Sequence, residues 1–158
     1  MPELFRKLEV MEVNVKKSFV LFAAVMMIFG LAACGNNDVA IDYGKSEIYS
    51  KSDMDAAIEV IKDEFAAWEG CELHSISYTS DECNGKENID WVNSLREDGS
   101  ITVTNESAEF TQCIEFVSDF HSPKVGGGGW EMDYEYTAWQ WWLARTDNGE
   151  WNLITWGY

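Results

Sequence analysis

The chain has 158 residues, of which 46% are hydrophobic, and a formal net charge of −17 at pH 7. This length suffices for one domain and is short for two. The excess of acidic residues argues against a nucleic-acid partner, because such binding depends on neutralising phosphates with Lys and Arg. It equally argues against binding of anionic lipid through a polybasic segment.

The first 33 residues have the order of features typical of a secretion signal. Lys16 and Lys17 supply positive charge, and an uncharged apolar run follows from Phe19 to Ala33. This run of roughly 15 residues is short for a membrane span, which needs about 20. It ends in Leu31-Ala32-Ala33, directly before Cys34. The small side chains of Ala32 and Ala33 suit a signal peptidase.

This ending resembles the lipobox of bacterial lipoproteins. The resemblance implies cleavage after Ala33 and a diacylglyceryl group with acyl chains such as palmitate on Cys34. The protein would then be lipid-anchored to the cell membrane on its extracytoplasmic face, and two acyl chains suffice for stable attachment. An uncleaved N-terminal anchor is the alternative, and it also exports the remaining chain.

Three segments follow from the leader and the composition. We expect a signal peptide over 1–33, whose true start we place at Met11, a lipidated tether over 34–46 that is polar and unpatterned, and a single domain over 47–158. From Cys34 onward the chain carries 7 lysines and arginines against 25 aspartates and glutamates, a formal charge of −18.

The clearest predicted element of the domain is a helix from about Lys51 to Glu69. Ser50 is a good N-cap, and Asp53 completes an acidic capping box. Gly70 can adopt the left-handed conformation that ends a helix. Apolar residues recur at steps of three or four and form one stripe: Met54, Ala57, Ile58, Ile61, Phe65 and Trp68.

Strands dominate the rest of the pattern. A short helix around Ile89–Leu95 interrupts them, and the Asn-Gly pair in Asp147–Gly149 predicts a hairpin turn. Leu73 is out of phase with Ile76, which predicts a β-bulge. The predicted strands are Leu73–Tyr78, Ile101–Thr104, Gln112–Phe120, Trp130–Arg145 and Trp151–Tyr158.

This element order favours an α+β fold, with a long N-terminal helix packed on a curved antiparallel sheet. Over residues 46–158 the chain resembles the NTF2-like, or cystatin-like, cone folds, and more narrowly uncharacterised exported lipoproteins of Gram-positive bacteria. The resemblance is carried by the Tyr49-Ser50-Lys51 helix start and by Tyr136, Thr137, Trp139, Trp141, Leu143, Arg145, Gly149, Trp151, Leu153 and Trp156-Gly157-Tyr158.

Tryptophan and tyrosine are concentrated in the last 29 residues. Most of these rings are expected to pack as core and cross-strand pairs. Trp141 and Trp142 are adjacent, so in a strand they face opposite sides, and one of them is either binding surface or covered by another element. The candidate ligand-binding residues are Tyr136, Trp139, Trp141 and Trp142.

The remaining polar groups give no catalytic motif, and the sequence predicts no cofactor and no metal site. Glu131, Asp133 and Glu135 would share one strand face, which we interpret as solvated rather than as a calcium site. His74 and His121 match no metal-ligand or nucleophile spacing.

Three cysteines follow Cys34: Cys71, Cys83 and Cys113. Export permits a disulfide, and an odd number allows at most one bridge among them. The sequence does not choose among the three pairings.

We therefore expect a membrane-anchored extracytoplasmic domain that is a non-catalytic binding or scaffolding module. One alternative is an NTF2-like enzyme acting on a small apolar or sugar-like molecule. Another is a protein–protein interaction subunit of an envelope complex. The expected partners are the membrane, through Cys34, and a small molecule or an envelope protein.

Overall fold

The computed structural model describes residues 38–101, 109–125, 129–147 and 149–158. The predictions on the leader, on the start at Met11 and on Cys34 lie outside these residues, as does most of the predicted strand at Ile101–Thr104. The described elements are, in chain order, β1 (Ala40–Asp42), α2 (Lys51–Phe65), β2 (Glu72–Tyr78), the 3₁₀ turn η1 (Asp81–Asn84), α3 (Lys86–Glu97), β3 (Gln112–His121), β4 (Glu135–Arg145) and β5 (Asn152–Gly157).

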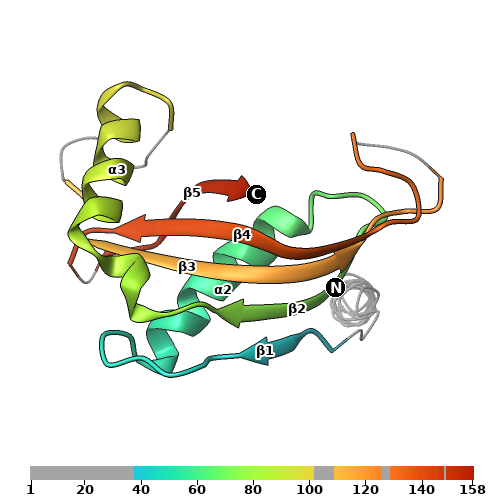
Figure 1. Cartoon of the computed structure of the whole chain (residues 1–158), viewed down its shortest axis with the longest axis horizontal. Coiled ribbons are helices and arrows are strands. Elements are labelled where there is room, and N and C mark those ends of the chain that lie inside the picture. Colours follow the sequence, from blue (N-terminus) through green and yellow to red (C-terminus); the bar gives the residue numbers. More distant parts are fainter. Residues whose placement is uncertain (1–37, 102–108, 126–128, 148) are drawn as a thin grey trace, which may run out of the picture. The chain divides into compact units, whose positions relative to one another are not determined.

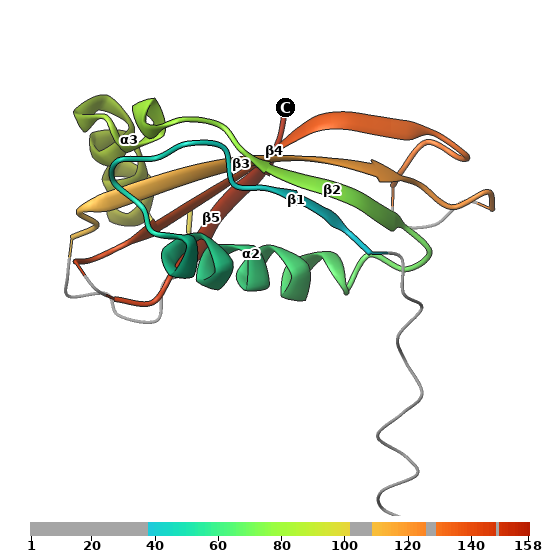
Figure 2. The same cartoon turned by 90° about the horizontal axis from the view of Figure 1, so that it is seen from below.

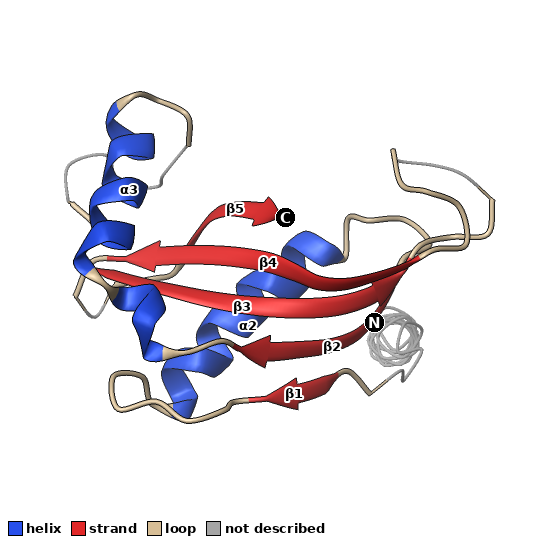
Figure 3. Ribbon diagram, in the orientation of Figure 1, coloured by secondary structure: helices blue, strands red, loops and turns tan. Residues whose placement is uncertain are grey.

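The strands form one five-stranded sheet in the order β1-β2-β3-β4-β5 (Figure 1; Figure 3). The pairs β2–β3, β3–β4 and β4–β5 are antiparallel. β1 pairs with β2 in parallel, with Ile41 opposite Ile76. The sheet is therefore mixed, and β1 comes from the segment that was expected to be an unpatterned tether.

The predicted fold class, a long N-terminal helix packed on a curved antiparallel sheet in an NTF2-like or cystatin-like cone, was wrong. The described residues instead form a mixed five-stranded sheet with two helices of 15 and 12 residues. A looser α+β description remains compatible with it. The alternative of an NTF2-like enzyme depended on that cone fold, so it loses its basis.

The start of α2 is as predicted. The Ser50 side chain accepts a hydrogen bond from the Asp53 amide, and the Asp53 carboxylate accepts one from the Ser50 amide, which completes the capping box. Its end is four residues earlier than expected. The amides of Ala67 and Trp68 bond to carbonyls three residues back, and this tighter winding does not continue an α-helix. Trp68 therefore lies in a turn, outside the helical stripe.

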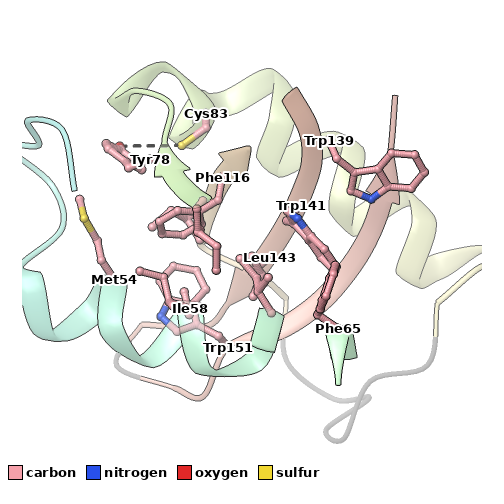
Figure 4. Close-up of a cluster of buried hydrophobic side chains, with 14 of the residues drawn as sticks. Met54, Ile58, Phe65, Tyr78, Cys83, Phe116, Trp139, Trp141, Leu143 and Trp151 are labelled. Atoms are coloured by element: carbon pink, nitrogen blue, oxygen red, sulfur yellow. Dashed lines mark hydrogen bonds between the residues drawn. The ribbon is translucent and has the colours of Figure 1, made fainter. Parts of the chain in front are cut away.

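Helix α2 lies on one face of the sheet, and α3 lies beyond the opposite face at one end (Figure 2). The α2 side contains the larger core, in which Met54 and Ile58 of the helix lie with Phe116 and Leu143 of the sheet (Figure 4). The α3 side contains a smaller cluster: Val92, Phe110, Cys113, Ala144 and Ile154. Burial on both faces fixes which side chains of each strand point to which core.

Two irregularities shape the strands. The predicted bulge in β2 is confirmed, because the register with β3 shifts between Leu73 and Ser75. A second shift lies between Ser118 and Phe120 of β3. Opposite it, Ala138 has a φ of 55°, and its amide donates to the Asp119 carboxylate at 2.9 Å, which stabilises this left-handed residue.

The predicted strand from Trp130 is shorter than expected, since β4 begins only at Glu135. Asp133 has a φ of 52° and donates its amide to the carbonyl of Pro123. This left-handed backbone is incompatible with a continuous strand. Residues 130–134 are instead a loop that leads into β4.

Candidate functional site

The four candidate ligand-binding residues do not form one site. Trp141 is fully buried in the α2-side core, and its indole donates to the Ser118 hydroxyl at 2.8 Å. Trp142 lies on the other side of the sheet, edge-on to Trp91 at 5.3 Å between ring centroids. Tyr136 and Trp139 are neighbours, with their ring centroids 5.6 Å apart.

Tyr136 and Trp139 belong to a group of rings that we call the aromatic cluster. Its members come from the turn after α2, from β3, from the loop before β4, from β4, and from β5 and the residue after it. They are Trp68, Phe120, Trp130, Tyr136, Trp139, Trp156 and Tyr158. It lies at the opposite end of the core from Met54 and Trp151, as the position of Trp139 in Figure 4 shows.

Trp139 is at the centre of this cluster. Its ring centroid is 5.0 Å from that of Tyr158, 5.5 Å from Trp130 and 5.9 Å from Trp156. Trp68 contacts the same group, 4.7 Å from Trp130. Edge-on and offset ring pairs at these separations are favourable beyond the area they bury. The cluster therefore orders segments that are far apart in the sequence.

Exposure rises steadily from the inside of the cluster to its rim. Phe120 is fully buried, Trp139 is 8% exposed, Trp156 is 40% exposed and Tyr158 is 77% exposed. The inner rings belong to the core, as the sequence predicted for most aromatics. The outer rings present apolar faces to solvent, so this rim can contact a ligand.

The indole N–H of Trp139 differs from those of its buried neighbours. Trp141 donates to Ser118, and Trp151 donates to the carbonyl of Asp53 at 3.0 Å. Among the described residues, the Trp139 Nε1 is buried and has no hydrogen-bond partner. A buried donor without an acceptor costs free energy, so it is an uncommon feature that calls for a reason.

Hydrogen bonds join the loop that contains Trp130 to the residue after β3, Ser122. The Ser122 amide donates to the carbonyl of Tyr134, and the Tyr134 amide donates to the Ser122 hydroxyl. The amide of Glu131 donates to the Tyr136 hydroxyl at 3.0 Å, which connects the loop to the aromatic cluster itself.

A histidine–carboxylate cluster lies beside this loop. Nδ1 of His121 is 3.0 Å from the Glu135 carboxylate, and Nε2 is 3.0 Å from the Asp133 carboxylate. The other oxygen of Glu135 is 2.9 Å from Nδ1 of His74. Only the imidazolium form of His121 can donate to both carboxylates. The Asp133 hydrogen bond first, and the Glu135 bond second, raise the pKa of His121.

Glu131, Asp133 and Glu135 are all exposed, as the solvated interpretation predicted, but they do not share one strand face. Asp133 and Glu135 pair with His121, and Glu131 and Asp133 lie in the loop before β4. The predicted shared face was wrong because it assumed a continuous strand. No group of three His, Cys, Asp or Glu side chains in the described part of the chain is placed to hold a metal ion.

The three cysteines are free thiols in the structure. Cys83 and Cys113 are buried, and the Cys83 thiol is 3.5 Å from the carbonyl of Cys113. Burial raises the pKa of Cys113 to about 12 and also raises that of the half-buried Cys71. A disulfide among them stays a prediction.

Comparison of the chain with protein-family models, with curated proteins and with solved structures gave no match. Within the described ranges, no helix has the length and apolar character needed to cross a bilayer.

Sequence reasoning missed two members of the cluster. Trp68 was assigned to the helical stripe and Phe120 to an ordinary strand core. The position of Trp68 at the predicted helix end, two residues before Gly70, was the available signal. The other five members lie in the aromatic-rich last 29 residues: Trp130, Tyr136, Trp139, Trp156 and Tyr158.

Proposed function

We propose that the protein is a lipid-anchored extracytoplasmic binding module, without catalysis, whose ligand site is the rim of the aromatic cluster. The leader and the Leu31-Ala32-Ala33-Cys34 sequence support export and acylation. The acidic composition supports a domain that stays soluble at the membrane surface rather than adhering to anionic lipid.

The observation that carries the binding role is the exposure of large rings at the rim. Trp156 and Tyr158 are exposed although Trp139, which they contact, is buried. Packing alone explains the inner rings but not the outer ones. Rigid amphipathic rings of this kind contribute large contact areas at low entropic cost in binding sites.

Acylation is tested by growing cells on an alkyne analogue of palmitate and detecting the label on the protein. We expect label on the wild-type chain at the mass of the processed form, and none on the Cys34→Ser variant. A precursor-mass protein recovered from the cytosol without label would contradict the anchor.

Binding is tested by thermal-shift measurements with a panel of neutral, cationic, anionic and apolar small molecules. A ligand that binds only the folded state raises the melting temperature. We expect at least one compound to stabilise the wild-type chain and not the Trp156→Ala/Tyr158→Ala double variant. No shift from any compound would contradict a small-molecule site and favour the protein–protein interaction subunit.

A further inference from the structure

We infer that the aromatic cluster binds an uncharged carbohydrate, with the indole N–H of Trp139 donating to one of its oxygens. This inference rests on the proposed binding role and names the class of ligand. It depends on three observations: an unpartnered buried donor, exposed ring faces beside it, and the sign of the surrounding charge.

The unpartnered donor defines what the ligand must offer. An indole N–H can only donate, and Trp139 Nε1 has no acceptor among the described residues although Trp139 is more than nine-tenths buried. The missing partner is therefore a hydrogen-bond acceptor. A quaternary ammonium ion, which aromatic cages also bind, has no acceptor to offer and does not satisfy this group.

The ring faces define the shape of the ligand. Trp139 and Trp156 stack on each other, 29° from parallel with their ring centroids 5.9 Å apart. The ring surface open to a ligand is that of Trp156 and Tyr158, which are 40% and 77% exposed. Flat apolar rings bind molecules that have one apolar face and a polar edge. A pyranose ring has both, because its C–H groups form a face and its hydroxyl and ring oxygens lie around the edge.

The charge disfavours an anionic sugar. The chain has a formal net charge of −17. Near the cluster, the exposed Glu131 belongs to the loop whose backbone bonds to Tyr136, and the two carboxylates of Asp133 and Glu135 share the single imidazole of His121. An anionic glycan would be repelled by this field, whereas a neutral one would not.

Access requires the rim to rearrange. Tyr158 is the most exposed ring of the cluster at 77%, and the residue before it, Gly157, has a φ of 143°. The Tyr158 ring, 5.0 Å from Trp139, turns about Gly157 and the sugar enters between the two rings. Tyr158 then still contacts the ligand, and a sugar oxygen accepts the indole N–H of Trp139.

The test uses the full chain, purified in a detergent without a sugar headgroup, on an array of neutral, anionic and amino-sugar oligosaccharides. The best neutral oligosaccharide is then titrated calorimetrically against the wild-type chain and two variants. Trp139→Phe removes the unpartnered N–H, and Trp151→Phe makes the same change at the far end of the core, where the N–H is bonded to Asp53.

We expect neutral oligosaccharides to bind and Trp139→Phe to weaken binding about tenfold, which corresponds to one hydrogen bond. Trp151→Phe should leave the affinity within about twofold of wild type. Circular dichroism and the melting temperature show whether each variant is folded.

Three results would overturn the inference: binding only to charged oligosaccharides, no binding to the array, or equal affinity of wild type and a folded Trp139→Phe variant. In each of these cases a shift by a non-sugar compound in the thermal panel would leave the broader binding role standing. No binding on the array together with no melting-temperature shift in the thermal panel would contradict both the carbohydrate inference and the proposed binding role.

Discussion

Arg145 and Asp53 form an ion pair that joins the end of β4 to the first turn of α2, with 2.8 Å between Nη2 and Oδ1. The Arg145 side chain is only 10% exposed, lies 4.2 Å from the Trp151 ring, and also donates to Gln112. Asp53 serves at the same time in the capping box with Ser50. One carboxylate therefore both starts the helix and attaches it to the sheet.

The Asp53→Asn variant should lose about 2 kcal/mol of unfolding free energy, because an almost buried guanidinium would lose its counter-charge. Urea denaturation monitored by circular dichroism measures the change. Glu59→Gln is the matched control on the same helix, since its pair with Lys62 is exposed and should contribute little to stability. Equal losses in the two variants would contradict the attachment role.

Acid should weaken the same attachment. The hydrogen bond from the Ser50 side chain, and then the Arg145 guanidinium, lower the pKa of Asp53 below its ordinary value of 3.8. A lowered pKa in the folded state contributes stability above the unfolded pKa, and this is lost as the pH falls through the folded pKa. Stability of the wild-type chain should therefore fall more steeply below about pH 4 than that of Asp53→Asn, as measured by urea denaturation across pH 2–6.

The stability that His121 contributes should be lost as the pH rises, in contrast to that of Asp53. Its two carboxylate partners raise its pKa above 6.5, so this contribution is fully present below the unfolded pKa and is lost as the pH rises through the folded pKa. NMR titration of the imidazole should show a raised midpoint, and the protection of the 131–135 amides, taken relative to their intrinsic exchange rates, should fall above it. In Asp133→Asn the midpoint should move back toward 6.5; an unchanged midpoint would show that Asp133 does not hold the ring.

Removing the Ser118 hydroxyl should lower the free energy of unfolding. Its hydroxyl accepts the indole N–H of the fully buried Trp141, so Ser118→Ala leaves a buried donor without an acceptor and should cost about 1–3 kcal/mol. Ser75→Ala is the control, because Ser75 is half-buried and bonds to Asp119 at 3.2 Å. Urea denaturation of both variants compares them, and a loss for Ser118→Ala no larger than for Ser75→Ala would contradict this role.

The thiols should differ in reactivity. Only the thiolate reacts with a maleimide, and burial both covers a thiol and raises its pKa. In the native protein Cys71 should label first, and Cys83 and Cys113 should label only on unfolding, as followed by mass spectrometry. Failure of the unfolded, unreduced chain to label at two of these cysteines would instead reveal a disulfide.

The local signals that proved reliable were those with a short-range cause. The Ser50 capping box, the bulge after Leu73 and the strand at Gln112 were readable because caps and side-chain alternation act within a few residues. The helix end was misplaced because Trp68 fits the stripe spacing, although its ring packs in the aromatic cluster instead.

Long-range pairing explains what was missed. β1 has three residues, and only its parallel pairing with β2 makes it a strand. Val39, Ile41 and Tyr43 do alternate, and all three are partly buried against the core, but this is too short a pattern to outweigh its polar surroundings. The left-handed residues Asp133 and Ala138 depend on contacts with Pro123 and Asp119 that no local pattern reveals.

The position of β1 sets the length of chain between Cys34 and the sheet. If Cys34 carries the lipid, six residue steps separate it from Ala40, the first residue of the sheet. Even a fully extended chain spans at most about 20 Å over that distance. Ala40 would then lie within that distance of the lipid-bearing residue, so a ligand of this domain would be captured near the membrane surface.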